Sequence, residues 1–401
     1  MNENYFSKNL VEKLSFPRLP GTNGEKKAQG LIETELKNLN IDGFQKQAFE
    51  YTTFFMNFLL RIYNFLVGLL MIVTLAFLVV NLFLLVFLFA AVLFVFSFYS
   101  RQIREKIQFK LTRIGKKRKS FNYIVDILPK SNENKVKPKQ TLVVFAHYDS
   151  ISMKLHPVFA GAIYLFALLG GTIFAFHITI ISILYLLNIL DSILLIQFIY
   201  GLFLVGLYSI QLFNSRGNES YGTIDNATSV ASAFKVINRF YPNQNRLENT
   251  HLIVVFTGAE EMGDCGANSF IEQRHSEFDN DTTFFLIPDS VGADEKTNLY
   301  AYAEGFPKKL YSPRIKSEIE TLLKKKSEEY KMKPMYIPPL IHFSTDHAPL
   351  KRFGYEFMIF LSSGRIHSEK DNLDNYYPEI LESFNAFFED LIIQMDLSIE
   401  G

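Results

Sequence analysis

The segment TLVVFAHYDS, residues 141–150, joins a short apolar run to a histidine and an aspartate. A run of this kind is typical of a strand that is buried on both faces of a parallel sheet. The segments HLIVVFT (251–257), TTFFLI (282–287) and EFMIFL (356–361) have a similar composition. Together they predict several buried strands of one sheet.

Further elements surround these strands. FNYIVDIL (121–128) predicts another strand, and EKKAQGLIETELKNL (25–39) places its apolar residues at helical spacing. The pattern predicts further helices at 226–241, at about 312–331, where Ser312 and Pro313 form the start, and at about 378–395. Strands separated by helices predict an α/β fold with a mostly parallel mixed sheet that is flanked by helices.

The overall composition excludes some classes of protein. The 401 residues contain 41 Lys and Arg against 41 Asp and Glu, so the chain lacks the basic excess that is usual in proteins that bind nucleic acid. Its single cysteine excludes a disulfide framework and a cysteine-based metal cluster. We therefore expect no nucleic-acid partner.

Charge is absent from three long apolar segments, residues 62–99, 157–190 and 192–215. A single helix of the 38 residues in the first run would be about 57 Å long, nearly twice the ~30 Å of a bilayer's hydrocarbon core. Two spans with a turn at Asn81 fit the first run better than one helix. The other two segments give one span before Asp191 and one span after it. Buried core helices are the alternative, but the length of these runs favours two transmembrane helical hairpins, about four spans, in a lipid bilayer.

Basic residues next to the apolar runs predict the orientation. Nine Lys and Arg lie between Arg101 and Lys119, whereas the turns at Asn81 and Asp191 carry none. The positive-inside tendency therefore places the termini and the polar segments in the cytoplasm. The first 50 residues are polar and show no apolar core of a signal peptide.

Side chains that bind metals recur just after the predicted strands. In chain order they are His147, Asp149, Asp225, Glu260, Glu261, Asp289 and His367. Because ligands of open α/β sheets gather beyond the carboxyl ends of the strands, these residues point to one common site. One such acid alone would more often be an exposed or capping residue, but the joint arrangement favours a site. Histidines and carboxylates without a cysteine suit a hydrolytic zinc centre.

Several motifs resemble metallopeptidase family 28, which comprises di-zinc aminopeptidases and relatives such as glutamate carboxypeptidase. The motifs are AHYDS (146–150), GTIDNATSVA (222–231), FTGAEEMGDCGA (256–267), PDSVGAD (288–294) and RIHSEKDNLD (365–374), in the order of the family. Residues 18–39 and 344–360 are also similar to the family's N-terminal helix region and Ser-Asp-His segment.

The resemblance implies a role for each site residue and two Zn²⁺ per chain. His147 and Asp289 would bind one zinc ion, Glu261 and His367 would bind the other, and Asp225 would bridge the two. Glu260 would be the general base that acts on the attacking water. Asp149 would orient His147 through the second ring nitrogen, and Asp346 would support the site.

The hairpins interrupt the catalytic domain that the resemblance implies. His147 and Asp225 must meet at one metal although the second hairpin separates them, so an even number of spans must lie between them. The first hairpin must also contain an even number of spans, because the N-terminal helix has to lie on the same side of the membrane as the sheet that it packs against. The predicted division is 1–52, 101–155 and 216–401 for the catalytic domain, with hairpins at 53–100 and 156–215.

The resulting hypothesis is a membrane-bound zinc exopeptidase that acts on peptides, and an aminopeptidase is preferred. The alternatives are a glutamate-carboxypeptidase-like or glutaminyl-cyclase-like enzyme, a receptor or scaffold with the same fold, and a transporter. His177 lies in an apolar run and Cys265 beside the glutamate pair, but packing roles suit both better than catalytic ones. The sequence leaves the oligomeric state and the side-chain preference open.

Overall fold

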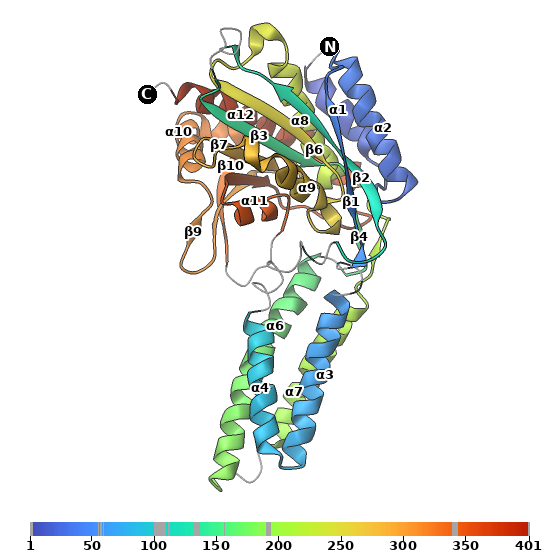
Figure 1. Cartoon of the computed structure of the whole chain (residues 1–401), viewed down its shortest axis with the longest axis vertical. Helices are drawn as coiled ribbons and strands as arrows, with labels where there is room; N and C mark the ends of the chain where they lie inside the picture. The colour runs from blue at the N-terminus through green and yellow to red at the C-terminus, as the bar shows by residue number, and fades with distance from the viewer. Residues whose placement is uncertain are drawn as a thin grey trace.

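The computed structural model describes residues 3–54, 56, 58, 60–99, 110, 113–130, 137–155, 157–189, 194–338 and 344–399. The chain forms an α/β part and a bundle of long helices that projects from it (Figure 1). The helices of the α/β part are α1 (Glu3–Leu14), α2 (Asn23–Asn38), α8 (Thr228–Phe240), α9 (Cys265–Arg274), α10 (Pro313–Tyr330), α11 (Ala348–Phe353) and α12 (Pro378–Leu397).

One large mixed sheet lies at the centre of the α/β part. Its strands are β1 (Gln45–Tyr51), β2 (Arg118–Ile127), β3 (Gln140–His147), β6 (Thr250–Thr257), β7 (Thr283–Pro288), β8 (Asn298–Glu304), β9 (Lys309–Leu310), β10 (Met332–Ile337) and β11 (Glu356–Leu361). The strand order is β1-β2-β6-β3-β7-β11-β8-β10, with β9 paired to β8. The central strands β6, β3, β7 and β11 run parallel, whereas β1, β2, β8 and β9 pair antiparallel with neighbours. The predicted α/β fold with a mixed, helix-flanked sheet is confirmed.

Helices cover both faces of this sheet, which explains why its central strands are apolar throughout. Alternate residues of β3 point to opposite faces. Leu142 and Val144 pack in a core with α1, α2, α8, α10 and α12, and Val143 and Phe145 pack in a second core with α9 and α11. The ring of Phe145, for example, lies 5.4 Å from that of Phe270.

The elements that the apolar patterns predicted for the α/β part are all present. The five predicted strands correspond to β2, β3, β6, β7 and β11, and the four predicted helices to α2, α8, α10 and α12. The edge strand β1, QKQAFEY, was not predicted, because most of its side chains face solvent and its sequence is polar. Strands β8 and β10 and helices α1 and α9 were also missed.

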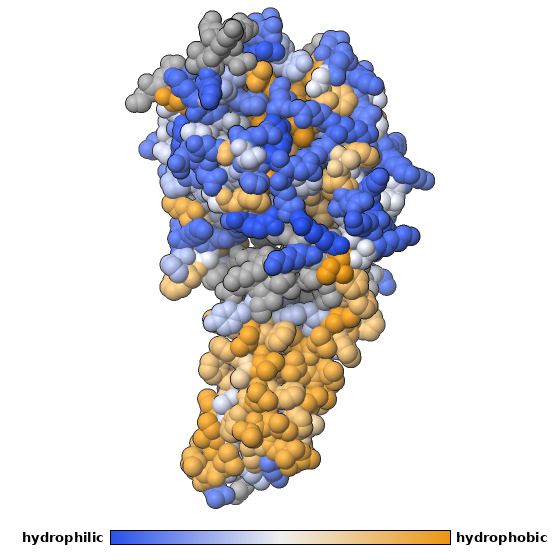
Figure 2. Space-filling model, in the orientation of Figure 1, coloured by the Kyte–Doolittle hydropathy of each residue, from blue (hydrophilic) through white to orange (hydrophobic). Residues whose placement is uncertain are grey.

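The bundle contains α3 (Leu60–Val79), α4 (Phe83–Phe98), α6 (Pro157–Leu186) and α7 (Leu194–Leu212). The four helices enclose an apolar core of their own, and the outer surface of the bundle is apolar as well (Figure 2). Asn81 lies at the turn between α3 and α4, as predicted, with a φ of 60°. Each hairpin returns the chain to the sheet, and a two-stranded ribbon of β4 (Ser152–Met153) and β5 (Arg216–Gly217) joins the second hairpin to it.

The number of predicted spans is not supported. Among the described residues, one helix, Phe159–Leu186, is long and apolar enough to cross a membrane. The apolar stretches Phe65–Val79, Phe83–Phe98 and Leu195–Ile210 have only 10–17 residues. The helix α4, for example, has 16 residues and is about 24 Å long, which is less than the ~30 Å of a typical hydrocarbon core. The predicted turn at Asp191 lies outside the described residues, and the predicted domain limits stay a prediction.

Candidate metal centre

The predicted ligands lie together at the carboxyl edge of the sheet. His147 is the last residue of β3, and Asp289 directly follows β7. Glu260 and Glu261 form a short helical turn just beyond β6. Asp225 lies in the turn before α8, and His367 lies in the loop after β11. Parallel neighbours end at the same edge, so residues far apart in sequence meet there.

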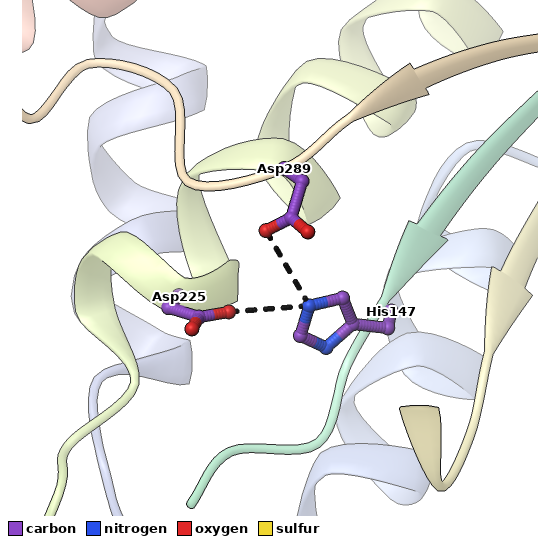
Figure 3. A group of neighbouring side chains, drawn as sticks. All are labelled: His147, Asp225 and Asp289. Carbon is purple, nitrogen blue, oxygen red and sulfur yellow. Dashed lines mark ion pairs between the residues drawn. The ribbon is translucent and has the colours of Figure 1, made fainter. Parts of the chain in front are cut away.

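The side chains form two groups that share Asp225. In the first, the Nε2 atom of His147 lies 3.2 Å from Oδ1 of Asp225 and 3.7 Å from Oδ1 of Asp289 (Figure 3). In the second, the Nε2 atom of His367 lies 2.9 Å from Oδ2 of Asp225 and 3.1 Å from Oε1 of Glu261. Within each group, one ligand atom per residue lies within 4.8 Å of the others. The two oxygens of Asp225 thus face two different histidines.

The donor set fits divalent cations. Oδ1 of Asp225 and Oε1 of Glu261 are buried, and the nearby histidine nitrogens make no well-aligned hydrogen bond to them, although buried polar atoms are normally paired. Nitrogen and oxygen donors without a thiolate suit zinc in a hydrolytic site. A cation at each group would satisfy these oxygens and offset the repulsion between the converging carboxylates.

The charged side chains of the site shift one another's pKa values. Burial lowers the pKa of both histidines, but the carboxylates around them, Glu260 at His147 and Glu261 at His367, outweigh it and hold each pKa well above its usual value. Burial also acts to raise the pKa of Asp225, yet the two histidines keep it below its usual range. Because metal ligands must be neutral histidines and ionised carboxylates, we expect metal binding at this site to depend on pH.

Glu260 lies outside both ligand groups. Its Oε2 atom is 4.0 Å from Nε2 of His147, and its side chain is 10% exposed. Burial, followed by the charges of Asp264 and Glu261, raises its pKa well above the usual value despite His147. A carboxylate that lies beside a group of metal ligands without belonging to that group is in the position of a general base.

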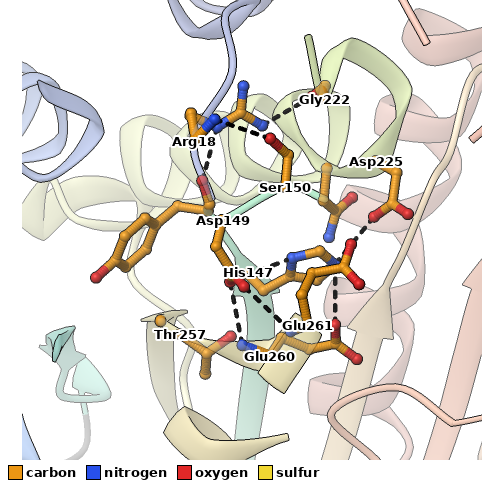
Figure 4. Close-up of polar contacts among 12 residues, drawn as sticks. Arg18, His147, Asp149, Ser150, Gly222, Asp225, Thr257, Glu260 and Glu261 are labelled. Carbon is orange, nitrogen blue, oxygen red and sulfur yellow. Dashed lines mark hydrogen bonds and ion pairs between the residues drawn. The ribbon is translucent and has the colours of Figure 1, made fainter. Parts of the chain in front are cut away.

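Asp149 holds the turn that carries the two glutamates. Its Oδ1 and Oδ2 atoms accept hydrogen bonds of 3.1 Å from the backbone N–H groups of Glu260 and Glu261 (Figure 4). Nδ1 of His147 lies 3.6 Å from Oδ1 of Asp149, which is longer than a hydrogen bond. That Asp149 orients His147 therefore stays a prediction. Its hydrogen bonds to the backbone of Glu260 and Glu261 give it a second role, which is to hold the turn that carries them.

Arg18 joins the segments that the hairpins separate, and the sequence did not single it out. This fully buried side chain donates to the backbone carbonyl oxygens of Tyr148 (2.7 Å), Tyr221 (2.9 Å) and Gly222 (2.8 Å) (Figure 4). The first carbonyl lies beside His147 and the other two lie just before Asp225. Arg18 thus links the N-terminal segment to both sides of the second hairpin, and a planar guanidinium with five donors suits such a task.

Two further acids support the site. Asp371 accepts a hydrogen bond of 2.6 Å from the backbone N–H of Ile224, next to Asp225. Asp346 is buried and accepts one of 2.5 Å from Thr257, and its burial raises its pKa to about 8. Asp371 belongs to the motif RIHSEKDNLD (365–374), but the sequence assigned it no role. Of the two residues to which the sequence assigned packing roles, Cys265 is buried at the first position of α9, and His177 lies on α6 in the bundle.

Comparisons with known proteins give a family match and similar folds. Residues 209–392 match the model of peptidase family M28. No curated protein matches the chain in sequence. Its fold is similar to that of a leucine aminopeptidase precursor from Bacteroides thetaiotaomicron VPI-5482, with a TM-score of 0.52 and 14% identity over 98% of this chain and 95% of that one. A glutaminyl cyclase from an Acidobacteriales bacterium gives a TM-score of 0.54 and 12% identity over 99% and 94%.

A third structure, an aminopeptidase from Aneurinibacillus sp. strain AM-1, gives a TM-score of 0.43 and 15% identity over 70% of this chain. The chain spans about half the length of that protein, 48%. At these identities the likeness concerns the fold.

Proposed function

We propose that this chain, which belongs to peptidase family M28 as its motifs indicated, is a membrane-bound exopeptidase with two zinc ions, and specifically an aminopeptidase. The observation that carries the proposal is the pair of ligand groups that share Asp225, with Glu260 beside them but outside both. The predicted ligand set is complete in this chain. A receptor or scaffold that had lost catalysis would have no need to retain it.

The residues divide the chemistry of amide hydrolysis among them. Two zinc ions at these groups would polarise the scissile carbonyl and lower the pKa of a water molecule. Glu260 accepts the proton of the attacking water and returns it to the leaving amine. Asp149 keeps Glu260 and Glu261 in place through their backbone N–H groups, so that base and ligand act from one rigid turn.

Metal analysis together with a panel of peptides tests this function. We expect two zinc ions per purified chain and release of the first residue from peptides with a free N-terminus. Peptides with an acetylated N-terminus should resist, whereas amidation of the C-terminus should have no effect.

Other outcomes of this experiment identify the alternatives. A single zinc ion, with conversion of N-terminal glutamine to pyroglutamate, would identify a glutaminyl-cyclase-like enzyme. Release of the last residue would identify a carboxypeptidase. Two bound zinc ions without turnover of any peptide would favour a receptor or scaffold.

The helical bundle supports the proposed insertion in a lipid bilayer. Its outward side chains are large and apolar, for example Phe159, Leu84 and Phe203, which are 68%, 83% and 62% exposed. Soluble monomers rarely expose an apolar surface of this extent (Figure 2). The helix α6 is long enough to span, and we propose that the three shorter helices are inserted beside it.

The charge asymmetry supports a cytoplasmic position for the α/β part. A Lys130→Cys variant tests it, because Lys130 is partly exposed at 37% and the only native cysteine, Cys265, is buried. A membrane-impermeant maleimide should label this variant only after the cells are opened. Labelling of intact cells from outside would place the α/β part on the other side.

A further inference from the structure

The hairpin between β8 and β9 presents an unusually exposed aromatic residue. Phe306 at its tip is 90% exposed, more than any other large hydrophobic residue that the structure describes. Leu310 on β9 is 39% exposed. A single exposed apolar side chain is common on protein surfaces, so its meaning depends on what lies around it.

The position of the hairpin indicates which surface that is. Along the longest axis of the molecule, the hairpin extends from the sheet toward the end that carries the bundle, and its tip reaches the level at which α6 begins (Figure 1). The apolar surface of the bundle starts close to this level (Figure 2). If the bundle is inserted in a bilayer, the tip of the β8–β9 hairpin therefore lies at the boundary between water and lipid.

The charges near the tip are basic. Lys308 and Lys309 follow the exposed phenylalanine, and both are exposed. Nζ of Lys308 donates a hydrogen bond of 2.7 Å to the hydroxyl of Tyr302 on β8, so that its ammonium group lies beside the strand behind the tip, while Lys309 follows on β9. The acid of the hairpin, Glu304, pairs with Lys351 at 2.6 Å. An aromatic residue beside lysines is the composition of segments that bind the anionic lipid interface.

The hairpin is held firmly, so that the tip projects in a defined direction. Ala303 and Glu304 of β8 pair with Leu310 and Lys309 of β9. The backbone N–H of Gly305 donates to the carbonyl of Ile337 at 3.1 Å, and this glycine has a φ of +74°, which suits a residue without a side chain. The exposure of Phe306 therefore belongs to a structured element of the fold.

We propose that the β8–β9 hairpin is a second membrane contact. Phe306 enters the headgroup region of the bilayer that holds the bundle, and Lys308 and Lys309 bind the phosphates of anionic lipids. This inference rests on the proposed insertion of the bundle. The two points of attachment fix the tilt of the sheet over the membrane, and with it the height of the metal centre, because β8 pairs with β11, which leads to His367.

The absence of tryptophan from the chain permits a direct test. Three full-length variants, Phe306→Trp, Phe203→Trp and Leu397→Trp, each carry one tryptophan. Phe203 is 62% exposed at the middle of α7, and Leu397 is 58% exposed at the end of α12, close to the C-terminus and away from the bundle (Figure 1). The proteins are reconstituted in bilayers of phosphatidylcholine and phosphatidylglycerol, with or without lipids brominated on their acyl chains.

The expected result is a loss of emission in brominated lipid for Phe203→Trp and Phe306→Trp but not for Leu397→Trp. Quenching of Phe203→Trp without quenching of Phe306→Trp overturns the inference and leaves the insertion of the bundle standing. If neither is quenched, the bundle lies outside the bilayer, and the proposed insertion fails together with the inference. Protection of Phe306→Trp from aqueous acrylamide without quenching by brominated lipid would mean that a protein covers the hairpin, which also overturns the inference.

The lysines are tested in the same background. Adding Lys308→Glu and Lys309→Glu to Phe306→Trp should reduce the quenching in bilayers that contain phosphatidylglycerol, since these substitutions replace attraction to anionic lipid by repulsion. Quenching that is unchanged by the two substitutions would overturn the role of the lysines.

Discussion

Replacing Glu260 by glutamine is expected to lower kcat roughly a thousandfold while both zinc ions stay bound. Glutamine has nearly the same shape as glutamate, but it cannot accept the proton of the attacking water. The ligand groups are left unchanged, since Glu260 belongs to neither of them. The measurement is kcat and KM on a peptide with a free N-terminus, together with the zinc content of the same preparation.

A matched control for this variant is Glu25→Gln. Glu25 is also a buried glutamate, and it accepts hydrogen bonds from Ser120 and from the backbone N–H of Gly21. Burial raises its pKa to about 6, and it belongs to neither ligand group. We expect this control to keep its activity. A Glu260→Gln enzyme with full activity would contradict the assignment of the base, and loss of zinc from it would make Glu260 a ligand.

Replacing Asp225 by asparagine is expected to remove zinc from both groups. The two oxygens of Asp225 lie 3.2 Å from Nε2 of His147 and 2.9 Å from Nε2 of His367, so that one substitution affects both positions. A neutral amide binds zinc far more weakly than a carboxylate. Loss of a residue that supports a ligand already costs about 10–100-fold in metal affinity, and loss of the shared ligand should exceed that. Competition with a fluorescent zinc chelator measures the effect without reference to activity.

The chain offers a second aspartate–histidine pair as the control. Asp126 lies 3.1 Å from Nε2 of His251 and 3.4 Å from Arg274, outside both ligand groups. Asp126→Asn should therefore retain two zinc ions with unchanged affinity. If Asp225→Asn lost only one of two zinc ions, Asp225 would serve a single metal, and the sharing inferred from its geometry would be wrong.

Local sequence patterns were sufficient for the centre of the sheet. Strands β3, β6 and β7 are buried on both faces, so their side chains are apolar almost throughout and the pattern is strong. The edge strand β1 lacks this signal, since water covers one side of it. The candidate ligands were predicted because they follow buried strands and occur in motifs similar to a known family.

The length of the bundle helices was not determined by composition. The charge-free runs predicted four spans, yet among the described residues only Phe159–Leu186 is both long and apolar enough to cross a membrane. Hydropathy marks the limits of an apolar run, whereas the helix begins and ends where the backbone turns. These turns are set by packing between helices and against the sheet.

The sequence by itself determined which residues are apolar, which residues carry metal-binding groups, and in what order they occur. The tertiary structure decided which of them meet. It gave Asp149 the task of holding the glutamate turn, it bonded Arg18 to carbonyl groups 130 and 204 residues further along the chain, and it exposed the tip of the β8–β9 hairpin at the level where the bundle begins. The physical reason is that these contacts depend on backbone hydrogen-bonding groups and on relative position. Every residue carries such groups, so they leave no mark in the sequence.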